Sequence, residues 1–319
     1  MNQYKFDTSK PVAVIGAGLV GAGWAIAFAR AGLDVRVYDA NPQVARDALP
    51  WAREQLAALH RHGLIDEPPG DVAARLVLTD SLEAALDGAA YAQESVLERV
   101  DVKRKLMTDI DDVAGDDVIV GSSSSGIQAS MFANDLRISP RVLIAHPVNP
   151  PYLVPVVELV PSTQTSQQTI DFTDTFMQAL GQSVVHVRKE IEGFVLNRLQ
   201  AALLREAWAL QRDGIASCED IDKTVRDGLG WRWSFMGPFE TIDLNAPGGV
   251  ADYANRLGPL YHSITQSRVD DGPWDAALIE RVEQDRRQYL DAADLGCRRE
   301  WRDERLMEFA VQRNKTGAR

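Results

Sequence analysis

The sequence contains few cysteines and no long apolar run. Its 319 residues include only two cysteines, Cys218 and Cys297, and neither has neighbours at the spacing of metal ligands. We therefore expect no disulfide framework and no metal site, and a reducing compartment. No apolar stretch is long enough to span a membrane, and the first residues, MNQYKFDTSKP, lack the apolar centre of a signal peptide. These absences predict a cytoplasmic protein with no membrane partner.

Basic residues are also in the minority. The chain has 34 lysines and arginines against 46 aspartates and glutamates, which gives a formal charge of −12. Because nucleic-acid-binding proteins typically carry a basic surface, we expect no nucleic-acid partner. A small anionic substrate remains compatible, since a site can be locally positive on an acidic protein.

Short β-branched runs alternate with amphipathic stretches over the first 190 residues. This alternation is typical of βαβ units and of a mostly parallel sheet. After residue 190 the apolar residues recur at helical spacing, beginning with one long predicted helix at 192–214. We therefore predict an α/β domain over residues 1–190 and an all-α domain over residues 191–319. The predicted strands lie at 12–18, 34–40, 75–79, 91–96, 117–123, 141–148, 154–160 and 183–189, and further helices at 18–32, 41–63 and 168–181.

A glycine-rich turn follows the first predicted strand. The stretch VAVIGAGLVGAGWA contains Gly16, Gly18 and Gly21 in the spacing G-x-G-x-x-G and opens a predicted helix. Such glycines allow a tight turn, a close approach of the backbone to a pyrophosphate, and close packing of helix on strand. Asp39 ends the second predicted strand about 20 residues further on, where a carboxylate binds the ribose hydroxyls. These residues predict a Rossmann-type domain that binds NAD rather than NADP.

His146 and Glu158 lie in the otherwise apolar, proline-containing run AHPVNPPYLVPVVELV. A buried charge is costly unless it is paired and hydrogen-bonded. His146 ends a predicted strand, and α/β proteins bind ligands at the carboxyl ends of parallel strands. A histidine oriented by a buried carboxylate is suited to accept a proton at neutral pH. The alternatives are a structural histidine and a glutamate that forms an ordinary salt bridge.

Several motifs together resemble the 3-hydroxyacyl-CoA dehydrogenase superfamily over most of the chain, namely GAGLVGAGWA, SSSSG, HPVNPPYLVPVVELVP, EGFVLNRLQ and MGPFE. The resemblance implies that His146 is the general acid and base of a dehydrogenase and that Glu158 orients it. It also implies that Ser125 and Asn197 hydrogen-bond the reacting oxygen of the substrate.

The same resemblance implies that Glu98, Lys103 and Asn149 lie along the NAD site. The alternative for Glu98 and Lys103 is a solvated pair at a helix start. The predicted helical domain also carries an apolar surplus, and the resemblance implies a homodimer formed through it.

The substrate is predicted from Arg232, which stands just before MGPFE. A planar guanidinium suits a carboxylate, which it holds with two hydrogen bonds. HPVNPPY, GFVLNRLQ and the C-terminal RREWRDERLM are most similar to the L-gulonate 3-dehydrogenases, a branch that includes the lambda-crystallins. This similarity implies a free 3-hydroxy acid as substrate, oxidised to the 3-keto acid. The alternative for Arg232 is a surface arginine stacked on a neighbouring tryptophan.

Three alternative functions stay open. An L-carnitine dehydrogenase needs an aromatic pocket for a quaternary ammonium, which Trp231, Trp233 and Phe235 are suited to form. A short-chain 3-hydroxyacyl-CoA dehydrogenase needs basic residues for the CoA phosphates, and the candidates are Arg61, Lys103, Arg104 and Lys105. The third is a non-catalytic NAD-binding protein of the crystallin type.

Overall fold

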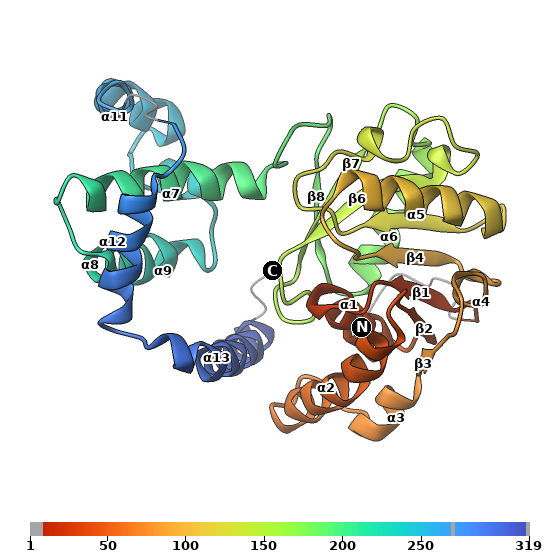
Figure 1. Cartoon of the computed structure of the whole chain (residues 1–319). Helices are drawn as coiled ribbons and strands as arrows, with labels where there is room; N and C mark the ends of the chain where they lie inside the picture. The colour runs from red at the N-terminus through yellow and green to blue at the C-terminus, as the bar shows by residue number, and fades with distance from the viewer. Residues whose placement is uncertain (1–8, 269–271, 317–319) are drawn as a thin grey trace. The chain divides into compact units, whose positions relative to one another are not determined.

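The chain forms a central sheet with helices on its faces, followed by a helical segment (Figure 1). The computed structural model describes residues 9–268 and 272–316. Contacts between residues divide the chain into two compact units. The first unit extends to Leu199 and includes Asp303–Gln312, and the second contains Gln200–Arg302.

The first unit is built on an eight-stranded sheet in the order β3-β2-β1-β4-β5-β6-β7-β8. Neighbouring strands are parallel except for the antiparallel pair of β6 and β7. Every strand overlaps a predicted one, which confirms an α/β fold with a mostly parallel sheet. The strands are β1 Val12–Ile15, β2 Val35–Tyr38, β3 Leu76–Leu78, β4 Tyr91–Glu94, β5 Ile119–Ser122, β6 Val142–Pro147, β7 Val156–Pro161 and β8 Ser183–His186.

Two hydrophobic cores cover the two faces of this sheet. Along β1, Val12 and Val14 belong to one core, and Ala13 and Ile15 belong to the other, because successive side chains of a strand point to opposite faces. Side chains from α1, α2 and α6 fill the first core, and side chains from α4 and α5 fill the second. The helices of this unit are α1 Leu19–Arg30, α2 Pro42–Arg61, α3 Pro69–Ala74, α4 Leu82–Leu86, α5 Val100–Val113 and α6 Gln167–Ala179, with short 3₁₀ helices η1 Ala129–Met131 and η2 Ser139–Arg141.

The order of the strands reverses beside β1. The chain runs outward from β1 to β2 and β3, then returns to place β4 on the other side of β1. Open α/β sheets bind ligands in the crevice at the carboxyl ends of the strands where this reversal occurs. The glycine-rich turn lies at the carboxyl end of β1.

The helical segment contains no strand among its described residues, as predicted. Its residues 200–302 bury only five described side chains: Ala209, Cys218, Thr241, Ala246 and Leu278. None of the helices in residues 9–268 and 272–316 has the length and apolar character of a membrane span. The elements are α7 Leu196–Arg212, α8 Cys218–Lys223, the π-helix η3 Thr224–Leu229, α9 Gly230–Trp233, α10 Pro238–Leu244, α11 Gly249–Gln266, α12 Ala276–Arg287, the 3₁₀ helix η4 Ala292–Asp294 and α13 Leu295–Thr316.

Candidate active site

The glycine-rich turn requires glycine at its first and third positions. Gly16 has a φ of 92°, and a Cβ there would lie 2.7 Å from the backbone of Ser95. A Cβ on Gly21 would lie 1.8 Å from the carbonyl oxygen of Gly16. The strand, turn and helix are therefore packed as closely as the sequence motif predicts.

The second glycine faces open space. Gly18 is the N-cap residue of α1 and provides no side chain to cap the helix, and a Cβ added to it meets nothing within 4 Å. The Asp39 carboxylate lies against this turn, because its Oδ2 accepts a hydrogen bond of 2.8 Å from the N–H of Ala17. An uncapped helix N-terminus attracts phosphate. The turn thus offers the two features that a dinucleotide needs, room for the pyrophosphate and a carboxylate beside it.

His146 and Glu158 face each other directly across the antiparallel pair of β6 and β7. Nδ1 of His146 lies 2.8 Å from Oε2 of Glu158, and the two side chains are only 7% and 2% exposed. The other carboxylate oxygen, Oε1, accepts hydrogen bonds of 2.9 Å from the N–H groups of Val195 and Leu196. Both oxygens of this buried carboxylate are therefore satisfied.

The carboxylate determines which nitrogen of His146 carries the proton. Burial raises the pKa of Glu158, but the hydrogen bonds from His146, Leu196 and Val195 outweigh burial and hold that pKa below its usual value. An ionised carboxylate only accepts hydrogen bonds, so Nδ1 must donate. The lone pair of neutral His146 is then on Nε2, which is the arrangement of a general base oriented by an acid.

A strained turn provides the two N–H groups that hold Glu158. Gly193 and Phe194 both have positive φ angles, 73° and 51°, and α7 begins only at Leu196. The predicted helix start at residue 192 is therefore wrong by one turn. The ring of Phe194 is fully buried and lies 5.7 Å from the His146 ring. A non-glycine residue with positive φ is uncommon and is often found at functional sites.

Ser125 and Asn197 lie together. Asn197 is in the first turn of α7, and its Nδ2 donates a hydrogen bond to the carbonyl oxygen of Ser125, which follows β5. Oε1 of Glu98 accepts hydrogen bonds from the N–H groups of Ser125 and Gly126, at 2.9 and 3.1 Å. Burial raises the pKa of Glu98, but Lys103 and these hydrogen bonds outweigh burial and hold that pKa below its usual value. Glu98 is thus an ionised anchor for this loop.

Lys103 is buried, not solvated. Its side chain is 1% exposed, and Nζ lies 2.9 Å from Oε1 of Glu94 and 3.3 Å from Oε2 of Glu98. Glu94, which ends β4 and is fully buried, is not among the site residues predicted from the sequence. The available signal was a glutamate inside the predicted strand YAQESV. Asn149 is exposed just after β6. Contacts of Lys103 and Asn149 with NAD stay predictions.

Arg232 belongs to the second unit. It lies in α9, directly after the π-helix η3, and π-helical turns are frequent at functional sites. Its guanidinium forms no hydrogen bond or ion pair with another residue of the described chain. The neighbouring Trp231 and Phe235 are 74% and 60% exposed.

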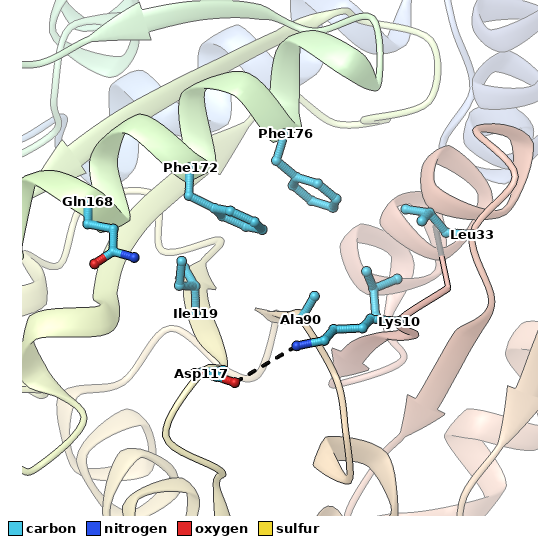
Figure 2. Close-up of a pocket in the computed structure, with 9 residues that line it drawn as sticks. Lys10, Leu33, Ala90, Asp117, Ile119, Gln168, Phe172 and Phe176 are labelled. Carbon is cyan, nitrogen blue, oxygen red and sulfur yellow. Dashed lines mark ion pairs between the residues drawn. The ribbon is translucent and has the colours of Figure 1, made fainter. Parts of the chain in front are cut away.

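A pocket of about 270 Å³ lies at the amino ends of the central strands, and Figure 2 shows residues that line it. Val12, Ala90 and Ile119 line it at the amino ends of β1, β4 and β5, whereas the glycine turn lies at the carboxyl end of β1. Lys10 and Asp117, an ion pair of 3.9 Å, lie at this pocket. The pocket therefore lies at the other end of the strands from the glycine turn.

Comparison with known proteins identifies the family of the chain. Residues 11–191 match the NAD-binding domain of 3-hydroxyacyl-CoA dehydrogenase, and residues 193–282 match its C-terminal domain. Rabbit lambda-crystallin (Oryctolagus cuniculus) is 40% identical over 306 residues, which cover 94% of this chain and 95% of that protein. L-carnitine dehydrogenase from Streptomyces griseus is 33% identical over 305 residues, 95% of this chain and 87% of its own.

A solved structure agrees with these sequence matches. The NAD⁺-dependent 5-formyl-3-hydroxy-2-methylpyridine-4-carboxylic acid 5-dehydrogenase superposes with a TM-score of 0.82 at 25% identity, covering 97% of this chain and 99% of its own. With two family models matched in order and the glycine turn of an NAD site in place, the chain belongs to the 3-hydroxyacyl-CoA dehydrogenase family of NAD-dependent dehydrogenases that act on CH–OH groups.

Proposed function

We propose that this protein oxidises the 3-hydroxyl group of a free 3-hydroxy acid, such as L-gulonate, to the 3-keto acid. The observation that carries the proposal is the 2.8 Å contact between His146 Nδ1 and Glu158 Oε2, which leaves Nε2 of the histidine as a proton acceptor. The 40% identity to lambda-crystallin supports the choice of substrate branch.

Each candidate residue has one task in this reaction. Bound NAD supplies the acceptor for the hydrogen that leaves C3 as hydride. Nε2 of His146 takes the proton of the C3 hydroxyl, and Glu158 stabilises the imidazolium that results. The second N–H of the Asn197 amide donates a hydrogen bond to the C3 oxygen, and the Ser125 hydroxyl, which donates to Glu98 Oε1 at 3.3 Å, turns from Glu98 to the same oxygen. Gly16, Gly18, Gly21 and Asp39 hold the dinucleotide.

A free carboxylate, rather than a thioester, is the proposed partner of Arg232. The guanidinium has no competing anion among the described residues, and it is suited to bind a carboxylate through two parallel hydrogen bonds. L-carnitine is itself a free 3-hydroxy acid, so the similarity to L-carnitine dehydrogenase supports the same substrate class. Because aromatic rings bind quaternary ammonium groups and Trp231 and Phe235 are exposed, a quaternary ammonium substrate is the second candidate.

An NAD-reduction screen tests the substrate. The proposal predicts turnover of at least one of L-gulonate, L-carnitine and 3-hydroxybutyrate, and slower turnover of 3-hydroxybutyryl-CoA. Exclusive turnover of the thioester would contradict the proposal, and binding of NAD without any turnover would favour a structural role.

Arg232→Met tests the carboxylate contact. We expect it to raise KM for the free acid about 10- to 100-fold, the value of a hydrogen-bonded charge pair. The control is Arg226→Met, because Arg226 lies in the adjacent η3 and is paired with Asp227. An unchanged KM in Arg232→Met would show that Arg232 does not bind the substrate.

We also propose that the protein is a homodimer formed through the helical unit. Residues 200–302 bury only five described side chains, while Ile215, Phe239 and Leu244 are 69%, 79% and 68% exposed. An apolar surface of this kind typically marks an interface, and a second copy of the chain is the occupant that the family resemblance implies. Sedimentation is expected to give the mass of a dimer, and a monomer at micromolar concentration would contradict the proposal.

A further inference from the structure

The buried side chain of Gln93 joins three neighbouring strands of the sheet. Gln93 lies on β4, is fully buried, and stands opposite Gly121 of β5 in the parallel register. Its Nε2 donates hydrogen bonds to the Ser123 hydroxyl at 2.7 Å and to the carbonyl oxygen of Ala145 on β6 at 3.3 Å. Its Oε1 accepts a hydrogen bond of 2.7 Å from the Tyr91 hydroxyl. Gln93 thus connects β4 with the end of β5 and with β6.

The chemistry of these partners determines the orientation of the Gln93 amide. A carbonyl oxygen only accepts hydrogen bonds, so the NH₂ group must face Ala145 and the amide oxygen is left for Tyr91. A buried polar group is costly unless it is hydrogen-bonded, and both ends of this amide have partners. A leucine of similar volume would fill the same space but would form none of these three hydrogen bonds. The amide therefore contributes contacts that packing alone does not explain.

Gly121 leaves the room that this arrangement needs. A Cβ on Gly121 would lie 1.8 Å from the Tyr91 hydroxyl oxygen and 3.0 Å from Cβ of Ala145. A glycine inside a strand often marks a site where another group approaches closely. Because Gly121 has no side chain, the Tyr91 hydroxyl lies against β5 and within reach of Gln93. The glycine in the strand sequence IVGS is therefore the local signal of this network.

The carbonyl group that Gln93 contacts belongs to the residue before His146. The paired residues of β5 and β6 end at Ser122 and Ile144, so Ala145 comes directly after the last of these pairs. On its other edge, β6 remains paired with β7. The hydrogen bond from Gln93 therefore continues the attachment of β6 to the central strands at the point where its pairing with β5 ends.

We propose that Gln93 is a positioning residue that acts through the Ala145 carbonyl to hold His146 in place for the reaction. This inference rests on the proposed function, in which His146 is the base. Ser123, the second partner of the Gln93 amide, lies two residues before Ser125, so one side chain holds both the loop after β5 and the end of β6. Loss of the amide would let these two segments move apart, while every proposed catalytic group and the glycine turn would stay chemically intact.

The test uses the full chain and three variants. Gln93→Leu removes the amide, and Tyr91→Phe/Gln93→Leu also removes the hydroxyl that Gln93→Leu would leave buried without its partner. Thr173→Val is the control, because Thr173 is fully buried in α6 and its hydroxyl donates to the carbonyl oxygen of Thr169 in the same helix at 2.8 Å. The measurements are the thermal midpoint, kcat, KM, the Kd for NADH, and the exchange of the His146 Nδ1 proton with water, followed by NMR.

The double variant Tyr91→Phe/Gln93→Leu decides the inference. We expect its thermal midpoint to fall by only a few degrees, about as far as that of Thr173→Val. Its kcat is expected to fall about 10- to 100-fold, as a displacement of about 1 Å at the reacting groups would cause. The Nδ1 proton of His146 should exchange at least about tenfold faster, because the strand end that carries the ring would open more often. Gln93→Leu alone is expected to show the same losses with lower stability.

The other measurements are expected to stay close to wild type. KM and the Kd for NADH of the double variant should change less than about threefold, because Gln93 is not among the residues predicted to bind either ligand. Thr173→Val should keep the wild-type kcat and the wild-type exchange of the Nδ1 proton.

The same double substitution in a His146→Gln background separates positioning of the histidine from a general loss of order. Residues that act as one unit have non-additive effects. Tyr91→Phe/Gln93→Leu should therefore lower the residual rate of His146→Gln by less than about threefold. An equal fold loss with and without the histidine would overturn the inference, because the amide would then act elsewhere.

Two further results would overturn the inference. Unchanged kcat and proton exchange in the folded double variant would show that Gln93 has a structural role only. A raised Kd for NADH with unchanged proton exchange would place the effect of Gln93 at the cofactor. Because proton exchange needs no substrate, it decides the inference even if no free 3-hydroxy acid is turned over, and that absence of turnover would count against the proposed function alone.

Discussion

Replacing Glu158 with glutamine changes a single heavy atom of the carboxyl group, but it changes which nitrogen of His146 carries the proton. The new side chain would keep one oxygen, and the N–H groups of Val195 and Leu196 would donate hydrogen bonds to it as they now do to Oε1. The amide nitrogen of the glutamine would then face Nδ1 of His146 at the present 2.8 Å. Since that amide nitrogen only donates, Nδ1 must become the acceptor and the ring proton must move to Nε2. The nitrogen that should accept the substrate proton would already carry one.

The expected loss of activity is large while the expected loss of stability is small. An acid-to-amide change with this effect on the tautomer lowers kcat by about 10⁴-fold in the serine proteases, which corresponds to ~5.4 kcal/mol of barrier. We expect a loss of about 10³- to 10⁴-fold here, measured as NADH formation at saturating NAD and hydroxy acid. The Kd for NADH should stay close to wild type, because Glu158 contacts His146 and the start of α7, not the glycine turn.

The control is the same substitution in a His146→Gln background. Two residues that act as one unit are non-additive, so Glu158→Gln should cost almost nothing once the histidine is gone. A loss of kcat below about tenfold in the single variant, or full additivity in the double variant, would refute the reasoning.

Two further predictions concern the cofactor turn and acid stability. Gly18→Ala should leave the stability of the ligand-free protein unchanged, because its Cβ meets nothing within 4 Å. It should weaken NADH binding about tenfold or more, or ~1.4 kcal/mol. Gly115→Ala, also in open space, is the control, and equal NADH binding by both variants would contradict the prediction. The pKa of Glu158 is lowered in the folded chain, so its ionised form adds stability that is complete above the unfolded pKa of about 4.3 and is lost as pH falls through the lower folded value. Urea denaturation should therefore show a steeper acid decline in the free energy of unfolding for wild type than for Glu158→Gln, and parallel curves would contradict this.

Much of the sheet was predictable because its signals are local. β-branched runs mark the strands, and the close packing around Gly16 and Gly21 can be read from their spacing alone. The pairing of His146 with Glu158 is partly local as well, because both lie in adjacent strands joined by a short connection.

Other parts of the site depend on contacts that sequence spacing does not encode. Lys103 resembles a solvated helix residue, and only the fold shows that it is buried against Glu94. Helical periodicity continues through Phe194, so the sequence predicts helix where the structure has a turn with positive φ. The hydrogen bonds from the N–H groups of Val195 and Leu196 to the Glu158 carboxylate outweigh the local helix propensity there.

The rate of NADH formation by His146→Gln, compared with wild type on the best free 3-hydroxy acid, tests the central claim most directly. General base catalysis by this histidine predicts a rate lower by about 10²- to 10⁴-fold, with NADH binding unchanged. A variant that keeps a rate within a few-fold of wild type would contradict the assignment of His146 as the base.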